Sequence, residues 1–395
     1  MDLKPKDLKA LRVEIDQIDR ELVRLLDRRA EIARVVGLSK ANSGMSTFDP
    51  GRAKAVITRA ISQSTGAFPR EGLTYVFREV LSACLNLQKP LKVGFLGPKD
   101  TFAHQAAIRE FGSSVDFNAY EQIREIFAAV ENGWIDYGVV PIENSTGGTV
   151  HYTLDAFIDH SAQICSEILL PISHSLLADC TLEEVTKVYS HPQAFLQCGI
   201  WLKENLPKAE HVEVGSTAQG MLQAKQVPFS AAIGSEIAAE QYGLRILAKG
   251  IEDSQDNTTR FLVISKSDSR PCGDDKTSLM FSVKDRPGAL YNILKPFNDL
   301  GVNLSKLESR PTKRKAWEQA FFVDATGHRE DPILRDAIAS LREHCEEVRI
   351  LGSYPREKTP REIEELQRIQ HLKAENGQET AQQGNDLGTE MEPIQ

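Results

Sequence analysis

Hydrophobic residues between positions 5 and 40 recur at spacings of three and four, and no internal proline or glycine interrupts the pattern before Gly37. This period predicts one long helix. At 1.5 Å per residue the helix would be about 50 Å long. Two shorter helices are predicted at 50–64 and 70–88, the first after Asp49-Pro50, a capping residue followed by a proline suited to a first turn. Because they are too short to cover the whole apolar face, we expect two copies of the long helix to pack in a dimer.

From residue 91 the pattern changes to short apolar runs that alternate with amphipathic segments. The strands expected first lie at 91–96, 137–140 and 166–172, with helices at 121–131 and 151–159. Such alternation predicts open α/β sheets, in which ligands bind at the carboxyl ends of strands.

The polar segment 268–276 reads as a linker. Residues 277–354 then give the order strand, helix, strand, strand, helix, strand. The expected strands lie near 278–283, 302–308, 317–324 and 346–352, and the helices near 288–299 and 332–343. This βαββαβ order is the ferredoxin-like α+β pattern.

Composition narrows the functional classes. A net charge of −9 over 395 residues argues against nucleic acid as a general partner. No apolar run approaches the roughly 20 residues of a membrane span, and the N-terminus has no signal-peptide core. The six cysteines are scattered without a C-x-x-C pair, which suits reduced thiols in the cytoplasm. We expect neither a metal nor a cofactor.

The segment Val139–Val150, V-V-P-I-E-N-S-T-G-G-T-V, concentrates polar groups where a buried strand ends. Gly147 and Gly148 allow a tight turn with positive φ, and Thr149 is a candidate N-cap for a helix beginning near His151. A strand–loop–helix junction offers free backbone N–H groups to an anion. The uncharged side chains favour a small, hydrogen-bonded substrate; the alternative is a well-capped loop without a ligand.

The N-terminal region resembles the all-helical chorismate mutase domain over residues 5–90. The resemblance rests on L-x-x-L-R-x-x-I-D-x-I-D, L-L-D-R-R-A-E-I-A, D-P-x-R at 49–52 and the helix ending L-N-L-Q. It implies that cations and Asp49 hold the substrate, with Lys40 and Gln88 as donors to the ether oxygen. The implied cations are Arg12, Arg29, Lys40 and Arg52, with Arg12 supplied by the partner subunit.

Such a rearrangement needs no nucleophile, only a compact substrate and positive donors where charge develops. Two positions depart from the family pattern: Ala53 stands for a glutamate and Cys84 for a serine, both normally near the substrate. Cys84 is kept in the expected substrate-binding set. The alternative for each cation is an ordinary solvated helix face.

Residues 91–266 resemble prephenate dehydratase. The motifs that carry the resemblance are G-P-x-x-T-F, V-P-I-E-N-S-T-G-G-T-V, S-H-P-Q-x-F-x-Q-C, A-A-I-G-S and N-x-T-R-F, with Asp100 standing where glycine is usual. The resemblance implies two α/β lobes around a cleft, as in a solute-binding protein. The implied substrate contacts are Thr101, Ser145, Thr146, Gly148, Thr217, Arg260 and Phe261.

Loss of carbon dioxide and hydroxide from prephenate is driven by aromatisation, so a donor at the leaving oxygen suffices. The resemblance makes Thr259 the best candidate, with Asn144, Ser190 and Gln197 in support. Arg260 could pair with a substrate carboxylate or be structural. His191 could be a general acid or could only shape its turn. Glu143 is expected to link the site to regulation.

The C-terminal region, with R-P-G-A-L at 286–290 and L-E-S-R-P at 307–311, resembles the ACT regulatory domain of these dehydratases. The resemblance implies a phenylalanine site at a dimer interface, because Gly288 at a helix start lets a carboxylate approach backbone N–H groups and Leu290 can cover the ring. The implied set is Gly288, Ala289, Leu290, Asn303, Glu308, Ser309, Arg310 and Pro311.

Together these features predict a bifunctional enzyme of phenylalanine biosynthesis, inhibited by phenylalanine. The expected boundaries are a mutase at 1–90, a dehydratase at 91–267, a linker at 268–276, an ACT domain at 277–355 and a tail at 356–395. The tail is expected to hold a charged helix at 358–374 and then to be disordered. Two alternatives stay open: a dehydratase that prefers arogenate, and an amino-acid sensor without turnover.

Overall fold

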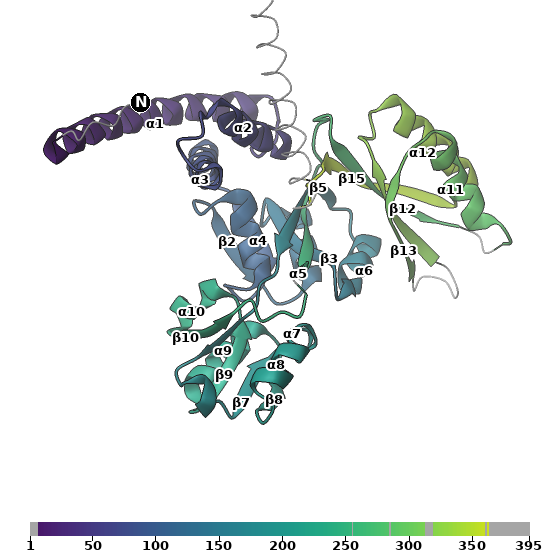
Figure 1. The fold of residues 1–395 in the computed structure, drawn as a ribbon. Coiled ribbons are helices and arrows are strands. Elements are labelled where there is room, and N and C mark those ends of the chain that lie inside the picture. The colour runs from purple at the N-terminus through teal and green to yellow at the C-terminus, as the bar shows by residue number, and fades with distance from the viewer. Residues whose placement is uncertain (1–6, 255, 284–285, 313–318, 360–361, 363–395) are drawn as a thin grey trace, which may run out of the picture. The chain divides into compact units, whose positions relative to one another are not determined.

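The computed structural model of the chain describes residues 7–254, 256–283, 286–312, 319–359 and 362. Met1–Pro355 form one unit and Arg356–Gln395 a second. The helices and strands of the described residues lie in the first unit (Figure 1). The helix and disorder predicted beyond residue 362 lie outside the described residues.

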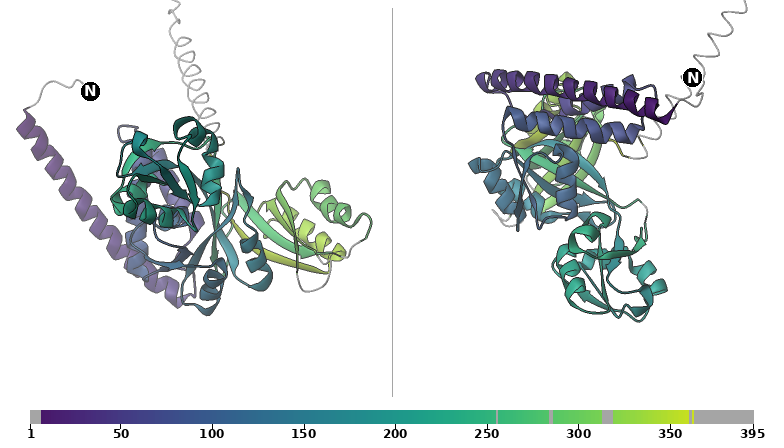
Figure 2. Two further views of the ribbon diagram at one scale, coloured as in Figure 1. Left: turned by 90° about the horizontal axis from the view of Figure 1, so that it is seen from below. Right: turned by 90° about the vertical axis from the view of Figure 1, so that its left-hand side faces the viewer.

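Three helices open the chain: α1 (Leu8–Asn42), α2 (Pro50–Gln63) and α3 (Arg70–Gln88). The start of α2 is fixed as predicted, because the Asp49 carboxylate accepts from the Arg52 backbone N–H at 2.9 Å and Pro50 follows. Helices α1 and α3 run side by side (Figure 2). Within one chain, α1 buries only Ala33 and Gly37. Its apolar stripe is exposed, at Leu11, Ile15, Ile18, Leu22, Leu25, Leu26, Ile32 and Val36.

The central region consists of two α/β lobes, as the resemblance implies. The first lobe has a sheet in the order β2-β1-β3-β11-β5, with β4 paired to β3. Its strands are β1 (Lys92–Leu96), β2 (Asp116–Tyr120), β3 (Tyr137–Asn144), β4 (Gly148–Thr149), β5 (Gln163–Pro171) and β11 (Thr258–Ser265), and its helices are α4 (Phe102–Phe111), α5 (Ile123–Asn132) and α6 (His151–Asp159). Strand β1 runs parallel to β2 and β3, whereas β11 is antiparallel to both β3 and β5.

The chain leaves the first lobe after β5 and returns to it through β11 (Figure 1). Between these points the second lobe has the strand order β10-β6-β9-β7-β8. Its strands are β6 (Ser175–Ala178), β7 (Lys187–Ser190), β8 (Glu210–Glu213), β9 (Ser230–Gly234) and β10 (Arg245–Lys249), and its helices are α7 (Pro192–Gln197), α8 (Gly199–Asn205), α9 (Thr217–Gln226) and α10 (Glu236–Tyr242). Two chain crossings thus join the lobes.

The C-terminal region has the predicted βαββαβ order and an antiparallel sheet β13-β14-β12-β15. Its elements are β12 (Asp275–Ser282), α11 (Ala289–Asp299), β13 (Leu304–Pro311), β14 (Gln319–Thr326), α12 (Pro332–His344) and β15 (Glu347–Pro355). Because β12 begins at Asp275, the last two residues of the predicted linker belong to a strand.

The C-terminal sheet packs against the first lobe. Phe322, Leu351 and Tyr354 share a buried cluster with Phe127 and Phe157 of that lobe. At the crossing of β15 over β5, a Cβ on Gly352 would lie 2.1 Å from the Ile164 carbonyl oxygen, so only glycine fits there. The C-terminal region is therefore joined to the central region through a shared core.

Two details of the 139–150 segment differ from prediction. Gly148 has the expected positive φ of 75°, but Gly147 does not. Thr149 is not an N-cap: the cap of α6 is Val150, and no side-chain cap bond forms. Thr149 lies in β4 and donates its hydroxyl to Glu308 of β13 at 3.0 Å. Because Glu308 lies 159 positions further along the chain, the local sequence around Thr149 could not predict this bond.

Candidate active sites

The polar residues of the 139–150 segment and of 257–259 meet where β3 ends beside the start of β11. Thr259 is paired with Asn144 in the ladder. The Asn144 Nδ2 group donates to Thr259 Oγ1 at 2.9 Å and to Asn257 Oδ1 at 2.8 Å. Its Oδ1 accepts from the Gly147 backbone N–H at 2.7 Å, which fixes the orientation of the amide. An amide and a hydroxyl are thus held side by side by backbone geometry.

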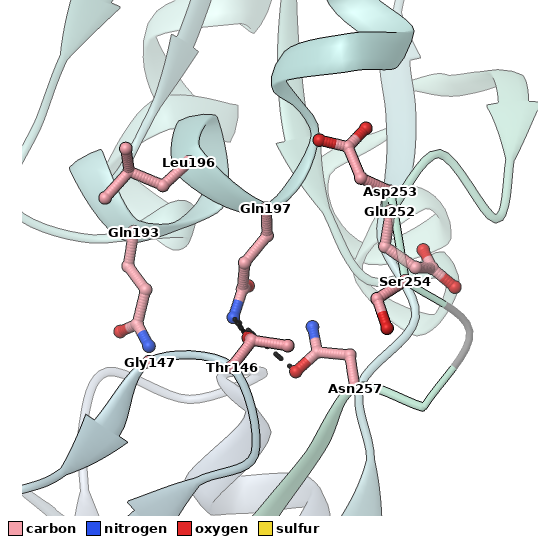
Figure 3. Close-up of a pocket in the computed structure, with 9 residues that line it drawn as sticks. All are labelled: Thr146, Gly147, Gln193, Leu196, Gln197, Glu252, Asp253, Ser254 and Asn257. Carbon is pink, nitrogen blue, oxygen red and sulfur yellow. Dashed lines mark hydrogen bonds between the residues drawn. The ribbon is translucent and has the colours of Figure 1, made fainter.

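Gln197, at the end of α7, reaches this pair from the second lobe. Its Nε2 donates to Thr146 Oγ1 at 3.0 Å and to Asn144 Oδ1 at 3.2 Å. A cavity of about 180 Å³ lies at this junction, with Gln193 and Leu196 on one side and Gly147 on the other (Figure 3). The lobes are therefore linked by uncharged hydrogen bonds at the point where the cavity opens.

The two carboxylates beside this cavity are already occupied by backbone donors. Glu252 accepts from the His174 backbone N–H at 2.7 Å. Asp253 accepts from the backbone N–H groups of Ile200 at 3.1 Å and Trp201 at 3.2 Å, at the start of α8. These bonds give both acids a structural role.

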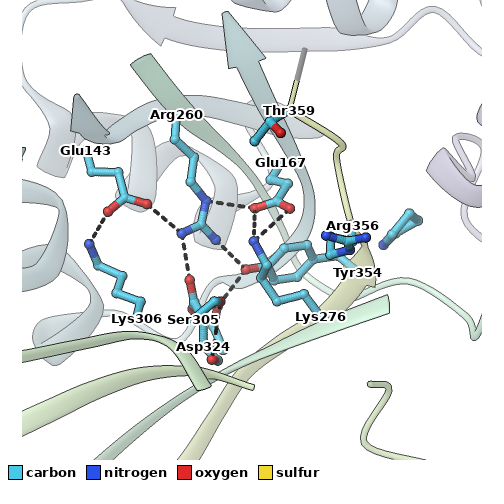
Figure 4. Close-up of polar contacts among 12 residues, drawn as sticks. Glu143, Glu167, Arg260, Lys276, Ser305, Lys306, Asp324, Tyr354, Arg356 and Thr359 are labelled. Carbon is cyan, nitrogen blue, oxygen red and sulfur yellow. Dashed lines mark hydrogen bonds and ion pairs between the residues drawn. The ribbon is translucent and has the colours of Figure 1, made fainter. Parts of the chain in front are cut away.

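Arg260 follows Thr259 in β11 but is buried, with 6% of its surface exposed. Its Nε donates to Glu167 at 2.7 Å, its Nη1 to Glu143 at 2.8 Å and to Asp324 at 2.6 Å, and its Nη2 to the Tyr354 hydroxyl at 2.9 Å (Figure 4). The guanidinium is used by protein groups. These contacts favour the structural alternative for Arg260, and its substrate contact stays a prediction.

The Arg260 cluster, defined as Arg260, Glu143, Glu167 and Asp324, also recruits cations of the C-terminal sheet. Lys306 of β13 pairs with Glu143, and Lys276 of β12 pairs with Glu167 at 2.9 Å (Figure 4). Burial acts to raise the pKa of Glu143, but Arg260 and Lys306 outweigh it and lower that pKa. Glu143 is therefore held ionised between strand β3 and the C-terminal sheet.

The cations of the N-terminal helices are less engaged. Lys40 donates to the Thr47 carbonyl at 2.6 Å and Arg29 to the Val80 carbonyl at 3.4 Å, while Arg12 is exposed on α1. Burial lowers the pKa of Lys40. The Oε1 of Gln88 is buried and has no hydrogen-bond partner among the described residues. This unpaired acceptor is available for a ligand.

The residues of β13 that were predicted for the phenylalanine-binding site alternate between the two sides of the strand. Lys306, Glu308 and Arg310 are half-buried, and Arg310 pairs with Asp155 of the first lobe at 2.9 Å. Ser309 and Pro311 point outward and are exposed. The side of the strand that carries Glu308 and Arg310 therefore lies on the first lobe within this chain, and their contact with phenylalanine stays a prediction.

The remaining residues of that set lie around α11. Gly288 is its N-cap with a φ of 79°, Ala289 is its first residue, and Leu290 is 38% exposed. Asn303 lines a cavity of about 440 Å³ together with Leu300 and Pro332. The positive φ explains why glycine is required at the start of this helix.

Comparison with known proteins now assigns the regions. Family models match at residues 11–89 for chorismate mutase type II, at 93–269 for prephenate dehydratase and at 277–343 for the ACT domain. A bifunctional chorismate mutase/prephenate dehydratase from Aquifex aeolicus is 46% identical over 356 residues, covering 89% of this chain and 98% of that protein. The chain belongs to this bifunctional family.

Two further relatives support the assignment. The bifunctional enzyme of Escherichia coli is 31% identical over 376 residues, covering 89% of this chain and 96% of that protein. Among solved structures, prephenate dehydratase from Arthrobacter aurescens in complex with L-Phe is 37% identical, with a TM-score of 0.64, and covers 67% of this chain and 90% of that chain.

Other predicted dehydratase residues are positioned by their own loops. Ser190 at the end of β7 donates to the Ile233 carbonyl at 3.2 Å, and Thr101 donates to the Leu96 and Pro98 carbonyls at 3.1 and 3.0 Å. Ser145 donates to the Asp256 carbonyl at 2.8 Å, and Thr217 is the first residue of α9. Each lies at a strand end or a helix start, as expected for ligand loops of an α/β fold.

Two residues in or beside the dehydratase motifs have structural roles. Phe261 is 2% exposed and belongs to the core of the first lobe, so its side chain packs against protein here, and its substrate contact stays a prediction. His191 is the N-cap of α7, and its Nδ1 accepts from the Gln193 backbone N–H at 3.2 Å. This contact favours the turn-shaping alternative.

Asp100, the departure from the dehydratase pattern, has a positive φ of 68°. This explains why glycine is usual there, since a left-handed backbone strains most other residues. Its backbone N–H donates to His104 Nδ1 at 3.1 Å. In the mutase domain, Ala53 packs against the cluster that contains Phe48 and Leu85.

Sequence reasoning missed two members of the dehydratase junction. Asn257 opens the N-T-T-R-F motif and accepts from Asn144, so that motif could have identified it. His174, which bonds Gln197 at 2.8 Å, lies outside the recognised motifs and had no such signal. No group of metal-ligating side chains occurs in the described part of the chain, nor does any described helix have the length and apolarity to cross a bilayer.

Proposed function

We propose that the chain catalyses two consecutive reactions, chorismate to prephenate in the helical domain and prephenate to phenylpyruvate in the two-lobed domain. The observation that carries the second assignment is the Asn144–Thr259 pair, held at the lobe junction by Gln197. Because Thr259 Oγ accepts from Asn144, its own hydrogen remains available for a substrate oxygen.

In the dehydratase step the bond between the ring and its carboxylate breaks, and its electron pair enters the ring as carbon dioxide departs. The ring C–O bond breaks at the same time, and the leaving hydroxide takes up a proton to become water. The Thr259 hydroxyl would stabilise the developing charge on that oxygen. The donors at this site are uncharged, which suits a reaction in which the ring carboxylate must leave as carbon dioxide.

In the mutase step, Lys40 and Gln88 would donate to the ether oxygen while arginines hold the carboxylates. The half-buried Lys40 supports this role. Arg12 is exposed on α1, which fits its use in the site of a second copy. A homodimer through α1 is therefore part of the proposal.

We further propose that phenylalanine binds the ACT domain and inhibits the dehydratase. The solved relative in complex with L-Phe supports this effector. The cavity at Asn303 and the glycine cap at Gly288 support a binding region around α11. Gly288→Ala should raise the phenylalanine concentration needed for half-inhibition at least tenfold, and unchanged affinity by calorimetry would contradict the site.

The proposed boundaries are 1–90 and 91–267, then a linker shortened to 268–274 and a C-terminal domain from β12 to residue 355. The six cysteines are all unpaired, which supports a reducing compartment such as the cytoplasm. No cofactor is required by either reaction.

The direct test of this proposal supplies purified protein with prephenate or arogenate and follows the aromatic product. Faster turnover of prephenate is expected, since the fused mutase delivers it. Preference for arogenate would favour the first alternative. Phenylalanine binding without turnover of either compound would favour the sensor.

A further inference from the structure

His174 is a buried histidine outside the recognised motifs, in the segment between β5 and β6. It is 2% exposed. Its Nε2 lies 2.8 Å from Gln197 Oε1, its backbone N–H donates to Glu252, and its ring meets the Phe102 ring edge-on at 5.5 Å. The side chain is thus fixed behind the residue that links the two lobes.

The hydrogen-bond partners determine which ring nitrogen carries the proton. Gln197 Nε2 faces three oxygens, Thr146 Oγ1, Asn144 Oδ1 and Asn257 Oδ1, so the amide oxygen of Gln197 must face His174. Because that oxygen only accepts, His174 Nε2 must donate. A flipped amide would set oxygen against oxygen at Asn144 and Asn257.

The second ring nitrogen supports the same arrangement. His174 Nδ1 is buried and has no partner among the described residues. A hydrogen there would be a buried donor without an acceptor, which is unfavourable. Burial also lowers the pKa of His174, which favours the neutral ring. The neutral tautomer with its hydrogen on Nε2 satisfies every contact.

We propose that His174 is a positioning residue of the dehydratase, whose Nε2–H orients Gln197 so that a one-way series of donors ends at Thr259. The series runs from His174 Nε2–H to Gln197 Oε1, from Gln197 Nε2–H to Asn144 Oδ1, and from Asn144 Nδ2–H to Thr259 Oγ1. Thr259 Oγ1 accepts a hydrogen bond from Asn144, and the Thr259 hydroxyl donates a hydrogen bond to the leaving hydroxyl of the substrate. The inference rests on the proposed dehydratase function.

The series also joins the two lobes. Gln197 belongs to the second lobe and His174 to the segment that enters it, whereas Asn144 and Thr259 belong to the first. If the Gln197 amide rotates, the cross-lobe bond is lost and the donor pair is no longer held against the second lobe. His174 therefore acts on turnover through Gln197, without touching the substrate.

The test uses two amide variants that differ in reach. In His174→Gln the side-chain nitrogen falls near the position of Nε2, whereas in His174→Asn it falls near Nδ1 and cannot reach Gln197. We expect His174→Asn to lower kcat for prephenate by about 10²-fold, the effect of misplacing a catalytic group, with KM within about twofold. His174→Gln should recover most of that loss.

A double variant tests the route. Gln197→Ala combined with His174→Asn should have the same kcat as Gln197→Ala alone, because both changes interrupt the same series of hydrogen bonds at Gln197. Multiplicative losses, or equal losses in His174→Gln and His174→Asn, would overturn the inference. Mutase turnover by the same proteins reports that each variant is folded.

The tautomer can be measured without any substitution. Nitrogen-15 NMR of the full chain with labelled histidine should show His174 neutral and protonated on Nε2, and protonation on Nδ1 would overturn the inference even if the variants fail to fold. If the unsubstituted protein does not turn over prephenate, the result refutes the proposed function instead. Full activity of His174→Asn in an otherwise active enzyme would refute only the role of His174.

Discussion

At the scale of single residues, the proposed catalytic residues alternate along β3 and β11 with residues that contact the C-terminal sheet. Asn144 and Thr259 face the lobe junction, while their sequence neighbours Glu143 and Arg260 face the C-terminal sheet. Successive side chains of a strand point to opposite sides, so neighbouring residues in the sequence contact different parts of the molecule. The site and its neighbouring domain are thus separated by the thickness of a strand.

Thr259→Ala should remove the donor to the leaving hydroxyl. Loss of one such donor lowers kcat by about 10²- to 10³-fold. Thr259→Ser keeps the hydroxyl and should retain most activity, which makes it the matched control. Prephenate turnover and binding by calorimetry separate the outcomes, and wild-type turnover in Thr259→Ala would contradict the assignment.

The lowered pKa of Lys40, caused by burial, predicts a pH effect on the mutase. Lys40 must be protonated to donate to the ether oxygen, and it loses its proton at a lower pH than an ordinary lysine. Chorismate turnover should therefore fall on the alkaline side below pH 10.5, the ordinary value. Prephenate turnover by the same protein is the control. A mutase profile that stays flat to that pH would contradict the role of Lys40.

What the sequence could predict at this scale follows from where each contact originates. Asn144 and Thr259 lie in contiguous motifs, and local backbone bonds hold the Asn144 amide, so the sequence could place both at one junction; their catalytic role stays a prediction. The sequence could not show the protein contacts of Arg260, Glu308 and Phe261, because the direction in which a strand residue faces its partners depends on which sheet packs against it. His174 was missed because its only relevant partner, Gln197, is 23 positions away.

At the scale of elements, the predicted helices and strands match the structure closely, with shifts at their ends. The 3.6-residue and two-residue periods come from burial of one face, which local sequence records. The linker prediction failed at Asp275 because pairing with β14 and β15 extends β12 backwards. The long-range pairing that makes a strand cannot be read from polar composition.

The Arg260 cluster is a polar contact between the dehydratase and ACT domains, and Asp324 of β14 is its C-terminal member. Asp324 is 5% exposed and also accepts from Ser278 at 2.5 Å. Removing one partner of a buried ion pair costs about 3–5 kcal/mol. Because Glu143 and Glu167 still pair with Arg260, Asp324→Asn should lower the free energy of unfolding by about 3 kcal/mol in urea, at the lower end of that range.

The pH dependence of stability gives a second readout of the same variant. Burial acts to raise the pKa of Asp324, but Arg260 and Lys276 outweigh it and lower that pKa. The stabilisation is therefore present above the ordinary aspartate pKa and is lost as pH falls through the lowered value. Asp324→Asn should flatten this acid limb. The control is Asp299→Asn, which loses only an exposed pair with Lys295 and should change both quantities far less. Equal changes in the two variants would contradict the cluster's role.

At the scale of the whole molecule, α1 is incomplete in a single chain. Its 35 residues bury two, and a row of leucines and isoleucines stays in solvent. An exposed apolar stripe of this length is typical of an interface. The resemblance places Arg12 of one subunit in the site of the other, so assembly and mutase chemistry should depend on each other.

Ile18→Asp combined with Leu22→Asp places charge in the centre of this stripe. We expect the variant to sediment as a monomer and to lose mutase turnover by at least about 10²-fold, since the Arg12 donor is absent. Prephenate turnover should largely remain. Asp27→Asn, on the opposite face of α1, is the control. A wild-type monomer, or a variant that stays dimeric, would contradict the interface.

The central claim is that one chain performs both steps and senses their end product. The most direct measurement supplies chorismate to the purified protein, follows its loss and the appearance of phenylpyruvate, and then adds phenylalanine. The account predicts that both steps proceed and that phenylalanine suppresses the second. Persistence of chorismate while added prephenate is consumed would reduce the helical domain to a dimerisation element, and failure to consume either substrate would contradict the account.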